Sequence, residues 1–121
     1  MAEDKITVLI SSCDSYSVLW DDFEVFFRKN WQLDCEVIVV SETIKNNSFK
    51  TITPGSNPWG SRNLDAIKNV KTELIFWLLD DYFLCESFSK DNLTRYINDF
   101  LEQKMDRLQL SPKGFEKQVY S

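Results

Sequence analysis

The chain has 121 residues, a formal net charge of −5 and no histidine, and 43% of its residues are hydrophobic. This length predicts one domain with a real hydrophobic core. The negative charge argues against nucleic acid as a partner, because an acidic chain repels phosphates, and the lack of histidine excludes Ser-His and Cys-His nucleophile pairs.

Three cysteines, Cys13, Cys35 and Cys85, lie far apart in the sequence. Without a C-x-x-C motif or histidine they do not form a zinc-binding pattern, and three unpaired cysteines are typical of a reducing compartment. The first residues are acidic, and the apolar run after them is too short for a signal peptide or a membrane-spanning helix. We therefore expect a soluble cytoplasmic protein.

Short apolar runs and helical patterns alternate along the chain. Residues 6–11 (ITVLIS) and 36–40 (EVIVV) predict strands that are buried on both faces. Between them, apolar residues at helical spacing predict a helix that Ser17 caps and that ends near Asn30.

Residues 43–60 contain several turn formers and predict an irregular segment, with a short edge strand at FKTIT (49–53). A helix is expected to open at Ser61. Its buried face is expected to carry Leu64, Ile67 and Val70.

Residues 73–79 (ELIFWLL) predict a third buried strand, which Asp80-Asp81 close. A further helix is expected from Ser89, with apolar residues at a period of 3.6 up to Met105. The alternating segment DRLQL (106–110) predicts a strand after it.

The predicted order of elements is therefore β-α-β-(β)-α-β-α-β. Buried strands that alternate with helices favour a three-layer α/β fold, with an open, mostly parallel sheet and helices on both faces. In such sheets ligands bind beyond the carboxyl ends of the strands. This rule places three segments at one edge, which we call the rim: Ser11 to Asp14, Ser41-Glu42 and Asp80-Asp81.

The residue types at the rim favour a nucleotide diphosphate bound with a divalent metal. Neither a G-x-G-x-x-G motif nor a P-loop occurs in the chain, which argues against a dinucleotide fold or a P-loop NTPase. The adjacent carboxylates of Asp80 and Asp81 suit Mg²⁺ or Mn²⁺ bridging to substrate phosphates. Arg62 suits a bidentate contact with a phosphate or a carboxylate.

Three segments resemble the N-terminal half of a family 2-like glycosyltransferase of the GT-A fold, a nucleotide-diphospho-sugar transferase with a Rossmann-like sheet. ITVLISSCDSY (6–16) is similar to the family's first strand, which ends on the nucleotide. EVIVVSET (36–43) resembles the strand that ends in an acid contacting the base. GSRNLDAIKNVKTELIFWLLDDY (60–82) is similar to the family's Arg-Asn, helix, apolar strand and D-x-D-like ending.

The resemblance implies a nucleoside-diphosphate sugar donor, with a UDP-sugar favoured, and transfer of the sugar to a glycan or lipid-linked acceptor. It implies that Ser11 and Asp14 line the nucleoside. It further implies that Glu42 meets the base or ribose, and that Arg62 lies near the diphosphate. The setting that it suggests is bacterial polysaccharide assembly in the cytoplasm, peripheral to the membrane through the acceptor.

For the metal, the resemblance implies that Asp80 touches the ribose or the ion and that Asp81 ligates Mn²⁺ or Mg²⁺. The ion would stabilise the leaving nucleoside diphosphate as a Lewis acid. The chain departs from the family in two places: Ser41-Glu42 stands where two acids are usual, and Asp-Asp-Tyr replaces the D-x-D spacing.

In the family the acceptor site and the catalytic base lie further along the chain, so no catalytic residue is assigned. Residues 1–121 are expected to form a single α/β domain, the donor-binding half of a longer GT-A domain. A sheet cut short in this way leaves an exposed edge or apolar face, so we also expect a homo-oligomer.

Two other classes of protein remain open. A receiver-like signalling domain shares the length, the alternation and the acidic strand ends, although its first loop would offer only Asp14. A non-catalytic α/β interaction module would use exposed aromatic residues such as Trp59 and Trp77. Structural roles also remain open for single residues: Asp14 in an Asx turn, Glu42 as a loop acid, and Arg62 at a helix start.

Overall fold

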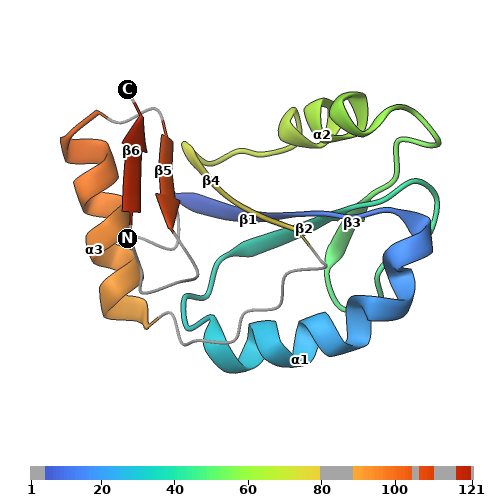
Figure 1. The fold of residues 1–121 in the computed structure, drawn as a ribbon, viewed down its shortest axis with the longest axis horizontal. Coiled ribbons are helices and arrows are strands. Elements are labelled where there is room, and N and C mark those ends of the chain that lie inside the picture. The colour runs from blue at the N-terminus through green and yellow to red at the C-terminus, as the bar shows by residue number, and fades with distance from the viewer. Residues whose placement is uncertain (1–4, 80–88, 105–106, 111–116, 121) are drawn as a thin grey trace. The chain divides into compact units, whose positions relative to one another are not determined.

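The structure is a computed structural model in which residues 5–79, 89–104, 107–110 and 117–120 are described. The chain divides into two compact units, residues 1–89 and 90–121. In the described residues the first unit has a four-stranded sheet with two α-helices, and the second has one α-helix and a two-stranded sheet (Figure 1). The expectation of a single domain stays a prediction.

The sheet of the first unit is parallel throughout, with the strand order β3-β2-β1-β4. The strands are β1 (Ile6–Ser11), β2 (Glu36–Val40), β3 (Lys50–Ile52) and β4 (Leu74–Leu79). β1 lies between β2 and β4, and all six of its residues are buried. Such burial is expected of a central strand in a parallel sheet, which is covered on both faces.

Two helices cover opposite faces of this sheet, α1 (Trp20–Asn30) and α2 (Trp59–Ile67) (Figure 1). Phe23 and Phe27 of α1 are buried. On the other face, a buried cluster joins α2 to the sheet: Leu9, Ile38, Val40 and Ala66. Helices on both sides of a parallel sheet confirm the predicted α/β class.

The start of α1 differs from the prediction. A short 3₁₀ helix, η2 (Asp14–Leu19), leads directly into α1, so Ser17 lies inside that turn and is not the cap. The N-cap position is Leu19, which makes no side-chain cap hydrogen bond. Asp21 and Asp22 do stand in the first turn of α1, where the positive end of the helix dipole favours acidic side chains.

The buried face of α2 also differs from the prediction, and the helix begins two residues earlier than expected. Its buried residues are Arg62, Asn63 and Ala66. Leu64 is 62% exposed and Ile67 is 37% exposed, so the expected apolar face was wrong for both. The Asn63 amide can be buried on this face because both of its polar atoms find hydrogen-bond partners there, as described below.

β4 was predicted to be buried on both faces, and this was wrong. Its residues alternate, with Ile75 and Trp77 exposed and their neighbours Leu74 and Phe76 partly buried. β4 forms one edge of the four-stranded sheet, so among the described strands it pairs only with β1. The expected self-association at such an edge stays a prediction.

The second unit begins with α3 (Lys90–Glu102), in which Leu93 and Ile97 of the predicted stripe are buried. β5 (Arg107–Leu110) was predicted, and it pairs antiparallel with β6 (Lys117–Tyr120), which was not. The short segment KQVY has too little alternation to indicate a strand by itself. In the described part of the chain, every helix is too short or too polar to cross a membrane.

Candidate functional site

The carboxyl ends of the parallel strands form the rim, and the structure brings several predicted site residues to it. Ser11 ends β1, and Glu42 follows β2. α2 returns from the carboxyl end of β3 toward the start of β4, so its first turns, which hold Arg62, also lie at this edge. The aspartates predicted to close β4, Asp80 and Asp81, lie outside the described residues.

Ser11 is buried, and its hydroxyl joins the end of β1 to α2 and to β4 through hydrogen bonds. Its Oγ donates a hydrogen bond to Asn63 Oδ1 at 2.5 Å and accepts one from Trp77 Nε1 at 2.5 Å. Asn63 Nδ2 in turn donates to the main-chain oxygen of Trp59 at 2.8 Å. The Ser11 hydroxyl therefore has a structural role within the rim, and its predicted contact with a nucleoside stays a prediction.

Asn63 was not predicted as a separate site residue, although it lies in the Arg-Asn pair of the segment 60–82. A signal was present, because Asn63, Ala66 and Val70 stand at positions i, i+3 and i+7 of a helical pattern. Such residues share one helix face. An amide on the same face as a buried alanine indicates a buried hydrogen bond to the sheet.

Asp14 holds the loop that follows β2. Its Oδ1 accepts hydrogen bonds from the backbone N–H groups of Thr43 at 2.9 Å, Ile44 at 3.0 Å and Glu42 at 3.3 Å. Its Oδ2 accepts one from Thr43 Oγ1 at 2.5 Å. The backbone N–H of Asp14 donates to Glu42 Oε1 at 3.2 Å, so the two loops hold each other. We call this set of contacts the Asp14 bracket.

The Asp14 bracket favours the ionised carboxylate. The hydrogen bonds from the Thr43 hydroxyl and then from the backbone N–H groups of Thr43 and Ile44 lower the pKa of Asp14 from 3.8 to about 2. This structural role differs from the Asx turn that the sequence left open for Asp14, because the carboxylate binds a loop 28 to 30 positions away.

The Asp14 bracket should make the protein less stable in acid. The folded state holds Asp14 at a pKa of about 2 against 3.8 without these contacts, so its contribution is complete above about pH 4 and is lost as the pH falls toward 2. Urea unfolding from about pH 6 to 2 should show a steeper loss in wild type than in Asp14→Asn. Asp21→Asn, which leaves the bracket intact, should keep the wild-type slope, and equal slopes for wild type and Asp14→Asn would contradict this account.

Arg62 is a buried cation at the rim. It is only 8% exposed, and its Nη1 donates to the main-chain oxygen of Asn57 at 2.7 Å. Among the described residues its buried Nε has no hydrogen-bond partner, and none of the ion pairs between them includes Arg62. Because a buried charge without a counter-charge is costly, an anion bound beside this guanidinium would remove a large unfavourable contribution.

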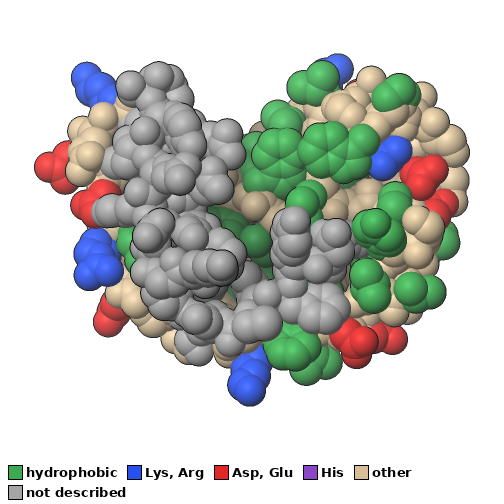
Figure 2. Space-filling model, in the orientation of Figure 1, with side chains coloured by type: hydrophobic (Ala, Val, Ile, Leu, Met, Phe, Trp, Pro, Cys, Tyr) green, Lys and Arg blue, Asp and Glu red, His purple; other side chains and the backbone are tan. Residues whose placement is uncertain are grey.

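Two tryptophans, one at the start of α2 and one in β4, stack on each other. The rings of Trp59, the first residue of α2, and Trp77 in β4 have centroids 5.6 Å apart and planes inclined by 13°. Both side chains are about half exposed, at 47% and 51%. Hydrophobic side chains gather at the surface between α2 and β4, where these elements meet (Figure 2).

The described residues hold no cluster of three or more side chains that could ligate a metal. Of the acids that are described at the rim, Asp14 and Glu42 are engaged with each other's loops. A metal at this rim would therefore depend on Asp80 and Asp81. The prediction of bound Mn²⁺ or Mg²⁺ stays a prediction.

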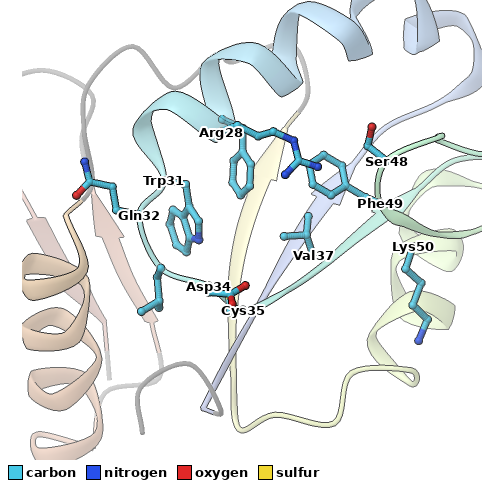
Figure 3. Close-up of a pocket in the computed structure, with 11 residues that line it drawn as sticks. Arg28, Trp31, Gln32, Asp34, Cys35, Val37, Ser48, Phe49 and Lys50 are labelled. Atoms are coloured by element: carbon cyan, nitrogen blue, oxygen red, sulfur yellow. The ribbon is translucent and has the colours of Figure 1, made fainter.

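A pocket of about 510 Å³ opens at the amino ends of the strands, opposite the rim, near the end of α1 and the start of β2 (Figure 3). Arg28 lies over the Phe49 ring at 4.8 Å and pairs with Glu24 at 2.6 Å, which lowers the pKa of that carboxyl. Lys50 points away from Trp31 in Figure 3, and its Nζ lies 3.9 Å from Glu36. Because both cations already have acidic partners, an anion would gain less here than beside Arg62.

No family model, curated protein or solved structure matches the chain. The case for a function therefore rests on the rim and on the sequence motifs that converge there.

Proposed function

We propose that the chain is the donor-binding half of a GT-A-like glycosyltransferase and that its rim binds a nucleoside-diphosphate sugar. The observation that carries the proposal is the buried guanidinium of Arg62, which has no carboxylate partner among the described residues. A diphosphate supplies the missing negative charge. Hydrogen bonds between arginine and phosphate are charge-assisted and often bidentate, and so are among the strongest that a side chain makes.

The architecture supports the same position for the ligand. In open parallel sheets ligands bind beyond the carboxyl ends of the strands, which is where Arg62 and the Asp14 bracket lie. The Glu42 carboxylate is bound through Oε1 in that bracket, so its other oxygen can accept a hydrogen bond from the base or ribose. Ser11 and Asp14 act in this proposal by shaping the nucleoside site.

A divalent ion completes the proposed site. Asp80 and Asp81 would hold Mn²⁺ or Mg²⁺, since paired carboxylates with substrate phosphates suit these hard cations. When bound, the ion supplies Lewis-acid stabilisation of the leaving nucleoside diphosphate. The favoured donor is a UDP-sugar, and the acceptor is a glycan or a lipid-linked sugar at the cytoplasmic side of a membrane.

The receiver-like alternative has less support from the described geometry. Its first loop offers Asp14 as the acid after β1, and that carboxylate accepts four hydrogen bonds from the loop after β2. The alternative of an interaction module would use the half-exposed side chains of Trp59 and Trp77 to bind a partner. Nucleotide binding distinguishes the proposed function from both.

The test is thermal unfolding with UDP, GDP, CMP and dTDP, each with and without Mn²⁺. A ligand at ~100 times its Kd that binds only the folded state stabilises it by roughly 2.7 kcal/mol. We expect one nucleotide to give a metal-dependent shift that Asp81→Asn loses. The control Asp22→Asn, an equal change of charge at an exposed position of α1, should retain the shift. Failure of every nucleotide to shift the transition would refute the donor site.

A further inference from the structure

The stacked pair Trp59–Trp77 is held by a closed circuit of contacts. Trp77 Nε1 donates to Ser11 Oγ, Ser11 Oγ donates to Asn63 Oδ1, and Asn63 Nδ2 donates to the main-chain oxygen of Trp59. The two indole rings close the circuit by stacking, with planes 13° apart. Side chains that are fixed in this way lose little freedom when a ligand binds, which favours affinity.

The circuit also determines which atoms of the pair remain available. The polar atom of Trp77, its indole N–H, is used by buried Ser11. What the half-exposed rings present is therefore mainly carbon surface and π-faces. The electron-rich face of an indole attracts groups that carry partial positive charge, and the C–H groups on one side of a pyranose ring are such groups.

The strand order places this surface relative to the other parts of the rim. In the order β3-β2-β1-β4, Glu42 follows β2, Ser11 ends β1, and Trp77 belongs to β4. In the proposed function the base or ribose lies toward Glu42. Since β1 separates β2 from β4, the stacked pair lies toward the opposite end of the nucleotide, where the sugar is attached.

We propose that Trp59 and Trp77 form a stacking platform for a pyranose ring, either the sugar of the donor or a sugar of the acceptor. The inference rests on the proposed function for its placement beside the nucleotide. Its chemistry, an aromatic face against the C–H face of a sugar, is the same for both sources of the ring.

Trp59→Leu is the variant that isolates the platform. The hydrogen bonds of the circuit use only the main-chain oxygen of Trp59, so the substitution removes the stacked ring and leaves each of these hydrogen bonds in place. Trp59→Phe keeps an aromatic face and serves as the conservative variant. Trp77 is less suitable, because its replacement would also remove the partner of Ser11.

Isothermal titration calorimetry should be run in the presence of Mn²⁺ with UDP, with UDP-glucose, UDP-galactose and UDP-N-acetylglucosamine, and with maltotriose and chitotriose. If the platform holds the donor sugar, Trp59→Leu weakens binding of a UDP-sugar about three- to ten-fold and leaves UDP unchanged. If it holds the acceptor, the variant weakens a trisaccharide by a similar factor instead. Trp59→Phe should restore most of the affinity in either case.

Unchanged affinity of Trp59→Leu for every saccharide and UDP-sugar that wild type binds would overturn the platform while leaving nucleotide binding intact. Absence of binding by UDP and all UDP-sugars to wild type would instead overturn the proposed function for UDP-linked donors. In that case only the titrations with trisaccharides test the platform. If wild type binds a trisaccharide and Trp59→Leu binds it more weakly, the platform proposal is supported. If wild type binds no trisaccharide, or if the variant binds it equally well, the platform proposal is refuted. Thermal unfolding of both variants confirms that each is folded.

Discussion

Arg62→Met is expected to give a protein that is more stable than wild type and that no longer binds a nucleoside diphosphate. Arg62 is 8% exposed, keeps a buried Nε without a partner, and has no carboxylate beside it among the described residues. A buried charge without a counter-charge is costly, and an apolar side chain of similar length removes that cost. We expect a gain of about 1 kcal/mol in the free energy of unfolding, or about 4 °C in Tm.

The loss of binding should be much larger than this gain. Removing one member of a buried charged hydrogen bond costs roughly 2–5 kcal/mol of binding free energy, so the nucleotide-induced shift should disappear. Lys68→Met, which removes an exposed charge at the C-cap of α2, should leave both quantities close to wild type. Arg62→Lys should bind weakly, because an ammonium cannot make the paired contacts of a guanidinium. Wild-type nucleotide affinity in Arg62→Met would remove the main support of the proposed function.

Ser11→Ala is expected to cause the largest loss of stability among simple rim substitutions, about 2 kcal/mol. The hydroxyl is buried and serves two partners, Asn63 Oδ1 and Trp77 Nε1. Without it the Asn63 oxygen in particular is left buried without a donor, and leaving such a group unsatisfied costs about 1–3 kcal/mol. The amide and the indole can no longer tie α2 and β4 to the end of β1.

Urea unfolding measures this effect, with the midpoint moving to lower urea at an unchanged slope. Ser17→Ala is the matched control, because Ser17 was predicted to cap α1 but does not occupy the N-cap position. Its removal should change the free energy of unfolding by less than about 0.5 kcal/mol. Equal effects of the two substitutions would show that the Ser11 hydroxyl contributes no more than an ordinary surface group.

Apolar periodicity was sufficient to predict the class of fold. The run at residues 6–11 is buried on both faces, as expected of a central parallel strand, and β2, β3 and the end of α1 fall where the patterns place them. β1, β2 and α1 follow from local spacing, since each buries side chains of the types that the pattern counts.

The orientation of α2 could not be predicted in the same way. Periodicity assumes that apolar residues are inside, whereas α2 buries Arg62 and Asn63 and exposes Leu64. Asn63 is satisfied by a serine 52 positions away, and no local pattern carries that information. The same reason applies to the stacked tryptophans, whose contact depends on how a helix and a strand are packed together.

The candidate site, like the fold, could be predicted from the sequence only in part. The rule for parallel sheets placed Ser11 and Glu42 at one edge correctly, because it depends only on where strands end. It could not show that Asp14 holds the backbone of residues 42–44, since that depends on the path of a loop that begins 28 positions later. The roles of Asp80 and Asp81 stay predictions.

The Asp14 bracket has a consequence for the energetics of any ligand that binds at the rim. Loops at binding sites are commonly ordered only when the ligand arrives, and that loss of conformational entropy weakens association. Here the carboxylate and the backbone N–H groups of the facing loop restrain each other through contacts within the chain itself. The conformational entropy of this loop is therefore lost during folding. A ligand that contacts Glu42 then binds to a surface whose shape is already fixed.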